Sequence, residues 1–113
     1  MTVAETAQAL GLEVLTGHAN LSREITGGCV SDLLSYVMGT AAAGNLWITI
    51  QVHPNIIGVV ELLDLAAVVV AHGQVPEEAT VSKAREQGIP LLTSAATAFA
   101  VSGRLYALMG SAP

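Results

Sequence analysis

A β-branched and aromatic, largely apolar stretch covers Leu46–Ile50 and is soon followed by a break at Pro54. A strand that is apolar on both faces is typical of the interior of a parallel sheet covered by helices. A second such stretch covers Ala66–Ala71. Between the two, Asn55–Leu63 has the apolar spacing of a helix. The pattern therefore predicts a right-handed βαβ unit with two buried, parallel strands.

Shorter elements are predicted on either side of this unit. We expect helices at 3–10, 33–38, 76–87 and 95–109 and strands at 13–15 and 89–92. Thr2 and Glu5 form a capping box for the first helix, and Thr93 or Ser94 is expected to cap the last. Pro90 places its strand toward a sheet edge. The segment 16–30 lacks periodicity, so it either hides a short strand near 23–25 or is a binding loop.

Two further assignments concern the helices at 33–38 and 95–109. Ser31 or Asp32 is expected to cap the former. In the latter, Phe99, Gly103 and Tyr106 have core-like spacing. Together the elements predict a single α/β domain over residues 1–113, with a mostly parallel central sheet of about four to five strands covered by helices on both faces.

The composition changes the picture of the helix at 55–63. Hydrophobic residues make up 52% of the chain and charged residues 12%, so polar side chains are too few to cover its surface. This helix is apolar almost all round, which predicts burial on two sides, the second against another subunit. The expected dimer interface consists of Ile56, Ile57, Val59, Val60 and Leu63.

Charge and cysteine content exclude several partners. A net charge of −5 with only four basic residues argues against nucleic acid and against an anionic membrane surface. No apolar run approaches the roughly 20 residues needed to cross a bilayer. The residues after Met1 lack the features of a signal peptide, and the single Cys29 fits a reducing compartment. A cytoplasmic location is therefore expected.

Four blocks of sequence, 23–35, 46–50, 53–57 and 88–92, resemble the DRTGG domain family. The resemblance extends over nearly the whole chain, although Cys29 stands where many relatives are expected to carry an aromatic residue. It implies a fold similar to the N-terminal domain of HPr kinase/phosphorylase and a tendency to self-associate. Such domains occur alone and in the regulatory parts of CBS-containing pyrophosphatases and phosphotransacetylases. The resemblance supplies no catalytic residues and hints at signalling or hydrogenase-linked metabolism.

Candidate ligand-binding residues follow from the rule that α/β proteins bind ligands where parallel strands end. The expected site consists of Arg23, Gly27, Gly28, Ser31, His53, Asn55, His72 and Gly73. Free N–H groups at nearby helix starts favour an anionic group. The alternative is that these residues are helix caps and turns with no ligand.

Catalytic chemistry lacks a recognisable set of residues. His53, His72 and Asp32 have no tight metal-ligand spacing, and no phosphate-binding loop accompanies Lys83. Nothing in the sequence places a histidine beside Cys29. We therefore expect no catalytic residue, metal or cofactor. The leading hypothesis is a non-catalytic regulatory module that acts as a homodimer, with a regulatory protein partner. The alternatives are a sensor for an anion or adenine nucleotide and a small hydrolase or transferase.

Overall fold

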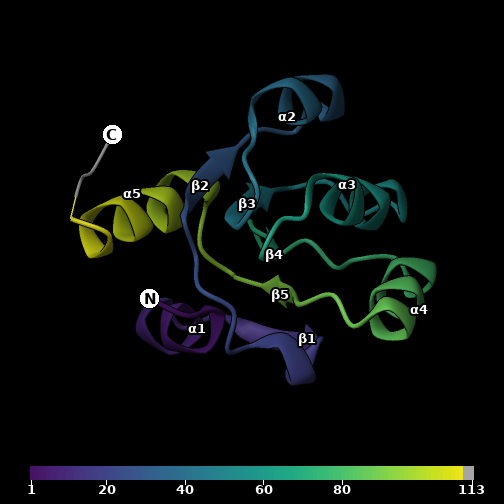
Figure 1. Cartoon of the computed structure of the whole chain (residues 1–113), viewed down its shortest axis with the longest axis horizontal. Helices are drawn as coiled ribbons and strands as arrows, with labels where there is room; N and C mark the ends of the chain where they lie inside the picture. The colour runs from purple at the N-terminus through teal and green to yellow at the C-terminus, as the bar shows by residue number, and fades with distance from the viewer. Residues whose placement is uncertain (111–113) are drawn as a thin grey trace.

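The computed structural model describes residues 1–110, which form five helices, one 3-10 turn and five strands (Figure 1). In chain order the elements are α1 (Val3–Leu10), β1 (Glu13–Thr16), a 3-10 turn (His18–Asn20), β2 (Gly27–Val30), α2 (Leu34–Thr40), β3 (Asn45–Thr49), α3 (Asn55–Leu63), β4 (Ala67–Val70), α4 (Glu78–Gln87), β5 (Leu91–Thr93) and α5 (Ala98–Leu108).

The five strands form one sheet in the order β1-β5-β4-β3-β2. Strands β2 to β5 are parallel to their neighbours, and β1 is antiparallel to β5. The predicted α/β class, with its mostly parallel sheet, is thus confirmed. The βαβ unit of β3, α3 and β4 is also present, because both strands are apolar on each face and need cover on each side.

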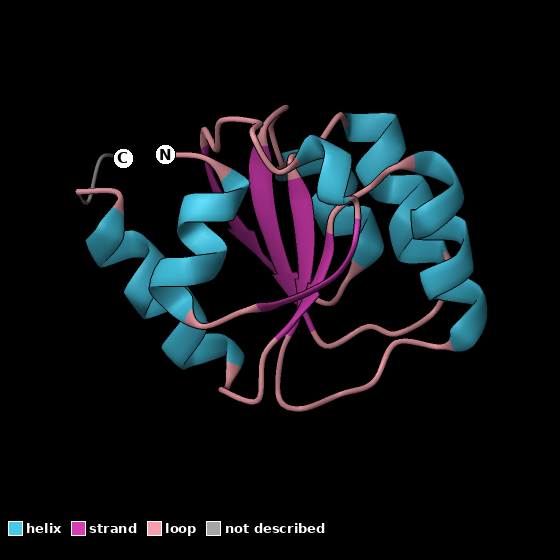
Figure 2. Cartoon of the chain, turned by 90° about the horizontal axis from the view of Figure 1, so that it is seen from below, coloured by secondary structure: helices cyan, strands magenta, loops and turns pink. Residues whose placement is uncertain are grey.

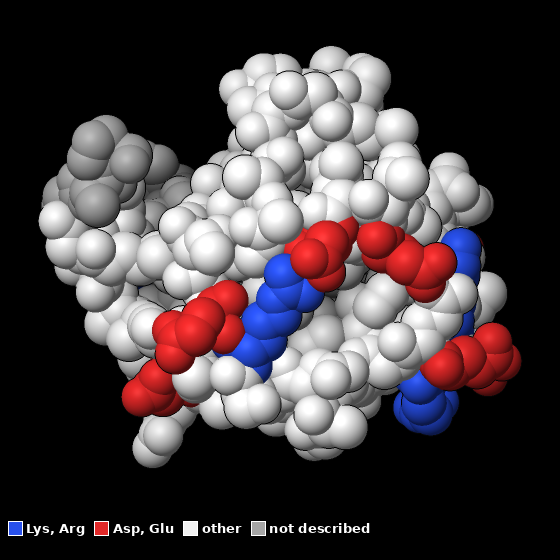
Figure 3. All heavy atoms as spheres, in the orientation of Figure 1, with Lys and Arg blue, Asp and Glu red and all other residues white. Residues whose placement is uncertain are grey.

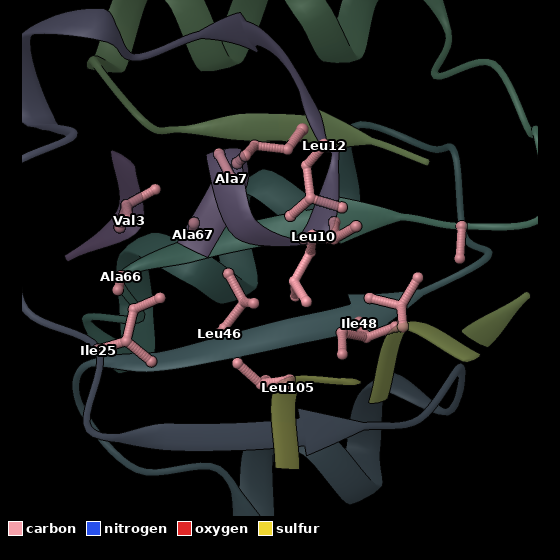
Figure 4. Close-up of a cluster of buried hydrophobic side chains, with 14 residues drawn as sticks. Val3, Ala7, Leu10, Leu12, Ile25, Leu46, Ile48, Ala66, Ala67 and Leu105 are labelled. Carbon is pink, nitrogen blue, oxygen red and sulfur yellow. The ribbon is translucent and has the colours of Figure 1, made fainter. Parts of the chain in front are cut away.

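Helices cover both faces of the sheet (Figure 2). On one face, α1 and α5 pack against a cluster that includes Val3, Leu46, Ile48 and Leu105 (Figure 4). On the other face, α2, α3 and α4 surround a cluster centred on Trp47, with Ile56, Ile57 and Leu91. Alternate residues of β3 therefore point into different clusters, as the two-residue period of a strand requires.

Helix α3 is buried by its own chain, which corrects the expected interface. It packs on β4 and lies between α2 and α4. Ile56, Ile57, Val59 and Val60 are buried, and Leu63 is half-buried against the same cluster. The expectation that another subunit covers these residues is wrong because the neighbouring helices already supply the second apolar contact. Among the large apolar side chains of this helix, only Leu62, 68% exposed, projects outward.

The segment before α2 differs from both interpretations of residues 16–30. Glu24 forms an isolated bridge with Thr2, whereas Gly27 and Gly28 are neither a turn nor a loop but the first residues of β2. Glycine is a weak strand former, so the strand depends on its pairing with β3. The ladder joins Gly27 to Asn45 and Val30 to Ile48.

Two local expectations at helix starts also require correction. Thr97, rather than Thr93 or Ser94, caps α5 by accepting a hydrogen bond from Ala100 N–H. Leu33 occupies the N-cap position of α2, so neither Ser31 nor Asp32 does. By contrast, the capping box of Thr2 and Glu5 is confirmed.

Two placements in the C-terminal part were wrong. Pro90 does not lead into an edge strand, since β5 lies between β1 and β4. Pro90 directly precedes β5, where its missing N–H costs no ladder bond, and its carbonyl accepts from Val68 N–H. In α5 the buried residues are Val101 and Leu105, whereas Phe99, Gly103 and Tyr106 face outward.

Candidate functional site

Five of the eight predicted ligand-binding residues lie at the carboxyl edge of the parallel strands. Ser31 follows β2, His53 and Asn55 follow β3, and His72 and Gly73 follow β4. Since these strands are parallel neighbours, their ends meet at one edge of the sheet. His53, Asn55, His72 and Gly73 are exposed, and Ser31 is half-buried. The structure thus brings this subset of the predicted site to one edge.

Local hydrogen bonds hold the histidine turns in place. Nδ1 of His53 accepts from Asn55 N–H at 3.0 Å, so this imidazole caps the start of α3. His72 adopts a left-handed backbone with φ of 62°. Its N–H donates to the carbonyl of Ala96, and Gly73 N–H donates to the carbonyl of Ser94. One ring nitrogen of His53 is therefore committed to structure, whereas the His72 ring is exposed beside the end of β5.

Asp32 joins the end of β2 to the end of β3. Its Oδ1 accepts from Thr49 Oγ1 and from Ile50 N–H, both at 2.8 Å. Gln51 Nε2 donates to the carbonyl of Asp32, and Trp47 Nε1 donates to the carbonyl of Ser31. This network connects the loop before α2 to β3, so Asp32 has a structural role.

Arg23, Gly27 and Gly28 lie at the opposite edge and do not join this site. Gly27 and Gly28 begin β2 beside the beginning of β3. Arg23 reaches the end of α3, where Nη1 donates to Asp64 Oδ1 at 2.7 Å and Nη2 donates to the Asp64 carbonyl at 2.9 Å. The eight residues therefore divide between two ends of the sheet, since Arg23, Gly27 and Gly28 lie before or at the start of β2 and cannot reach the end where β3 and β4 finish.

The ion pair of Arg23 and Asp64 borders a cavity of about 340 Å³ at the amino edge of the sheet. Hydrogen bonding to Asp64 raises the pKa of Arg23, and the same contact lowers the pKa of Asp64. Glu61, Gln87 and Ile89 also line the cavity. Glu24, which follows Arg23 in the sequence, pairs with the Met1 ammonium group. The ion pair forms one wall of this cavity.

A second cavity, of about 320 Å³, lies at the carboxyl edge. Gly73, Gln74 and Val75 line it from the segment after β4, and Glu13 and Leu15 line it from β1. Of the predicted site residues only Gly73 takes part. The contribution of β1 could not be read from the sequence because nothing there signals an antiparallel pairing with β5.

The described residues offer little for catalysis. No group of three His, Cys, Asp or Glu side chains within residues 1–110 could hold a metal ion. Cys29 is buried, and burial raises the pKa of its thiol, which favours the unreactive protonated form. Every buried side-chain nitrogen or oxygen of the described residues has a hydrogen-bond partner. None of the helices in residues 1–110 is long and apolar enough to cross a membrane.

Exposed apolar side chains are concentrated around β2. Seven of the eleven large exposed hydrophobic residues belong to β2, to α2 with its N-cap, or to α5: Val30, Leu33, Tyr36, Met38, Phe99, Tyr106 and Leu108. Phe99 is 88% exposed and Tyr106 60%. We call the surface of β2, α2 and α5 the β2 side. In Figure 3 the charged groups lie mainly over the half of the molecule away from α2.

Comparison with known proteins places the fold. The chain is similar, with a TM-score of 0.73 over 92% of its length, to a crystal structure of the CBS and DRTGG domains of the regulatory region of Clostridium perfringens pyrophosphatase, complexed with its activator diadenosine tetraphosphate. The two share 14% sequence identity, and the chain spans 45% of the length of that chain. No family model and no curated protein matches the sequence. The chain thus has the α/β fold of a domain from a regulatory region.

Proposed function

We propose that the chain is a DRTGG-like regulatory module that has no catalytic activity of its own and acts as a homodimer. The observation that carries the proposal is the concentration of exposed apolar side chains on the β2 side. Exposed apolar side chains that gather on one part of a surface mark sites of protein–protein contact. The structural likeness to a regulatory region, rather than to a catalytic domain, agrees with this role.

Regulation by such a module works through the chains that it contacts. A dimer presents two copies of every other surface, so a further regulatory protein of the cytoplasm can bind symmetrically. Hydrogenase-linked metabolism and signalling remain the settings in which we place that partner. The chemistry of the described residues supports contact rather than turnover, because the polar side chains that are buried all serve internal hydrogen bonds.

Native mass spectrometry of the purified protein tests this proposal. We expect a dimer at micromolar protein, and no hydrolysis of nucleotides or phosphate esters. Exclusively monomeric protein would contradict the homodimer. Turnover that a single point mutation abolishes would contradict the non-catalytic role.

A second candidate function is an adenine-nucleotide sensor at the carboxyl edge. It is favoured by the activator diadenosine tetraphosphate in the similar pyrophosphatase region and by the cavity beside Gly73. The test is chemical-shift mapping with diadenosine tetraphosphate and ATP. Shifts at His53, Asn55, His72 and Gly73 would support a site at this edge. Shifts confined to α4, or none at millimolar nucleotide, would reject it.

A further inference from the structure

The two edges of the sheet differ in how they are protected. Natural proteins blunt exposed edge strands with charges, prolines, bulges or short length, because unpaired backbone groups recruit other strands. At one edge, β1 carries the exposed Glu13 and an irregular register between Val14 and Thr16. At the other edge, β2 has neither a charge nor a proline, and it pairs with β3 regularly over all four residues. Apart from its shortness, β2 lacks these protections.

The outer side of β2 is accessible to another backbone. Directly after the strand, Ser31 N–H donates inward to the carbonyl of Ile48, so the alternation of a strand turns the N–H group of Cys29 toward β3 and those of Gly28 and Val30 away from it. Within residues 1–110 no strand pairs with this side. Gly28 and Val30 are exposed, Val30 to 47%. A second strand at the usual spacing of about 4.8 Å would meet no side chains at Gly27 and Gly28, so these positions leave room for its own.

Apolar side chains flank this edge on both faces of the sheet. Helices α2 and α5 both pack against β2. Helix α5 passes close to the strand, since a Cβ added to Gly28 would lie 3.0 Å from Leu105 Cδ2. Phe99 and Tyr36 are exposed on these two helices. A partner strand paired with β2 would therefore meet apolar side chains on both faces of the sheet. We call the line along which the two strands would pair the β2 seam.

The charge distribution supports a second copy of this chain as the occupant of this edge. Helices α2 and α5 and strand β2 contain a single charged residue, Arg104, and the loop before α2 adds the opposite charge of Asp32. Eight acidic and three basic residues lie elsewhere, so the whole net charge of −5 resides outside the β2 side. Two copies repel each other through their acidic surfaces, but contact through the β2 side brings no net charge together and avoids this repulsion.

We propose that two copies join through antiparallel pairing of their β2 strands about a twofold axis, which extends the two five-stranded sheets into one of ten strands. This inference rests on the proposed homodimer and specifies its geometry. Directly opposite residues of an antiparallel pair share a face, so Gly28 of each copy can lie opposite Val30 of the other. The missing side chain at Gly28 leaves room for the valine.

The first test compares two aspartate substitutions of exposed valines. Val30→Asp places an acid on each side of the seam and is expected to weaken dimerisation by at least about tenfold, measured by sedimentation equilibrium. Val75→Asp is the matched control, because Val75 is 81% exposed in the connection between β4 and α4, far from β2 in the order of strands. An equimolar mixture of Val30→Asp and Val30→Lys should recover dimers that neither variant forms alone.

The possible outcomes distinguish a failure of the proposed β2 pairing from a failure of the proposed homodimer. If the unmodified protein is dimeric and both aspartate variants stay equally dimeric, the β2 seam is wrong and the homodimer stands. If both variants dissociate alike, the specificity of the seam is also contradicted. Unmodified protein that is only monomeric would overturn both proposals.

Hydrogen exchange gives a second readout that needs no substitution. In the dimer, the amides of Gly28 and Val30 should exchange slowly, and dilution to monomer should speed their exchange by at least about tenfold. The amide of Ser31 is the internal control, because it donates to the carbonyl of Ile48 within the chain. Rapid exchange of Gly28 and Val30 in dimeric protein would overturn the seam even if Val30→Asp failed to fold.

Discussion

Arg23 binds Asp64 twice, through the carboxylate and through the backbone carbonyl of the same residue. Asp64 ends α3 in a left-handed conformation with φ of 56°. The guanidinium thus connects the segment before β2 to the end of a helix 41 residues further along the chain. One side chain fixes the amino edge of the sheet at a point where the chain reverses.

This ion pair predicts a dependence of stability on pH. Arg23 holds the pKa of Asp64 below its ordinary value of 3.8. A carboxyl with a lowered folded-state pKa stabilises the fold above its unfolded pKa, and the contribution is lost as pH falls through the folded value. We expect Asp64→Asn to lower stability at neutral pH and to leave a smaller further loss below about pH 4.

Urea unfolding at neutral and acidic pH measures this difference. The control is Glu61→Gln, since Glu61 is exposed on the same helix and forms no ion pair with any residue of 1–110. Equal pH dependence of Asp64→Asn and the unmodified chain would contradict the prediction.

Burial of α3 within one chain predicts a large effect of truncation. Ile57 is fully buried among β4, α2 and α4, so Ile57→Ala should lower the free energy of unfolding by about 2–5 kcal/mol. Leu62→Ala on the exposed side of the same helix should change it by less than about 0.5 kcal/mol. Chemical denaturation of the two variants checks the contrast. A loss for Ile57→Ala that depends on protein concentration would instead indicate burial between subunits.

Two glycines with similar backbones should respond differently to alanine. Gly17 and Gly11 have φ of 78° and 67°. A Cβ at Gly17 would lie 2.5 Å from the carbonyl carbon of Ile89, whereas nothing lies within 4 Å of one at Gly11. Gly11→Ala should cost about 1–2 kcal/mol for its left-handed conformation. Gly17→Ala should cost more than this, because the backbone before β5 must also move. Thermal unfolding of both variants tests the order, and equal losses would reject the close approach.

The hydroxyl of Thr49 is predicted to be structural. It is buried, donates to Asp32 Oδ1 and accepts from Gln51 N–H. Thr49→Val leaves both partners without this bond and should lower the free energy of unfolding by about 1–3 kcal/mol. Thr40→Val, at an exposed position of α2, is the matched control and should stay within about 0.5 kcal/mol of the unmodified chain. An unchanged free energy of unfolding in Thr49→Val would contradict the prediction, because it would show that water replaces these hydrogen bonds.

Hydrophobic pattern predicted the centre of the fold and failed at its margins. The runs at β3 and β4 are apolar on both faces, which only a covered parallel sheet accommodates. Gly27 and Gly28 carry no such signal, and they form a strand because β3 offers a ladder. The apolar residues of α3 were assigned to a dimer interface. A sequence pattern cannot distinguish burial against a neighbouring helix from burial against a neighbouring subunit.

The candidate site was predicted in part for the same reason. His53 and His72 each follow a recognisable strand, so parallel pairing brings them to one edge. Arg23 precedes a strand that the pattern did not reveal, and its partner Asp64 could be found only once α3 and β2 were placed. The cavity beside Gly73 depends on β1, whose direction is a tertiary property.

The pairing of β1 with β5 sets an order on folding. Strands β2 to β5 join through connections between parallel neighbours, whereas Glu13 finds its partner Thr93 only across most of the chain. Val3 and Leu10 of α1 share a cluster with Leu105 of α5. Strand β1 has its pairing partner only in β5, so residues 13–16 stay unpaired during synthesis until residues 91–93 have been made. The first strand in the sequence therefore joins the sheet only after the last one is available.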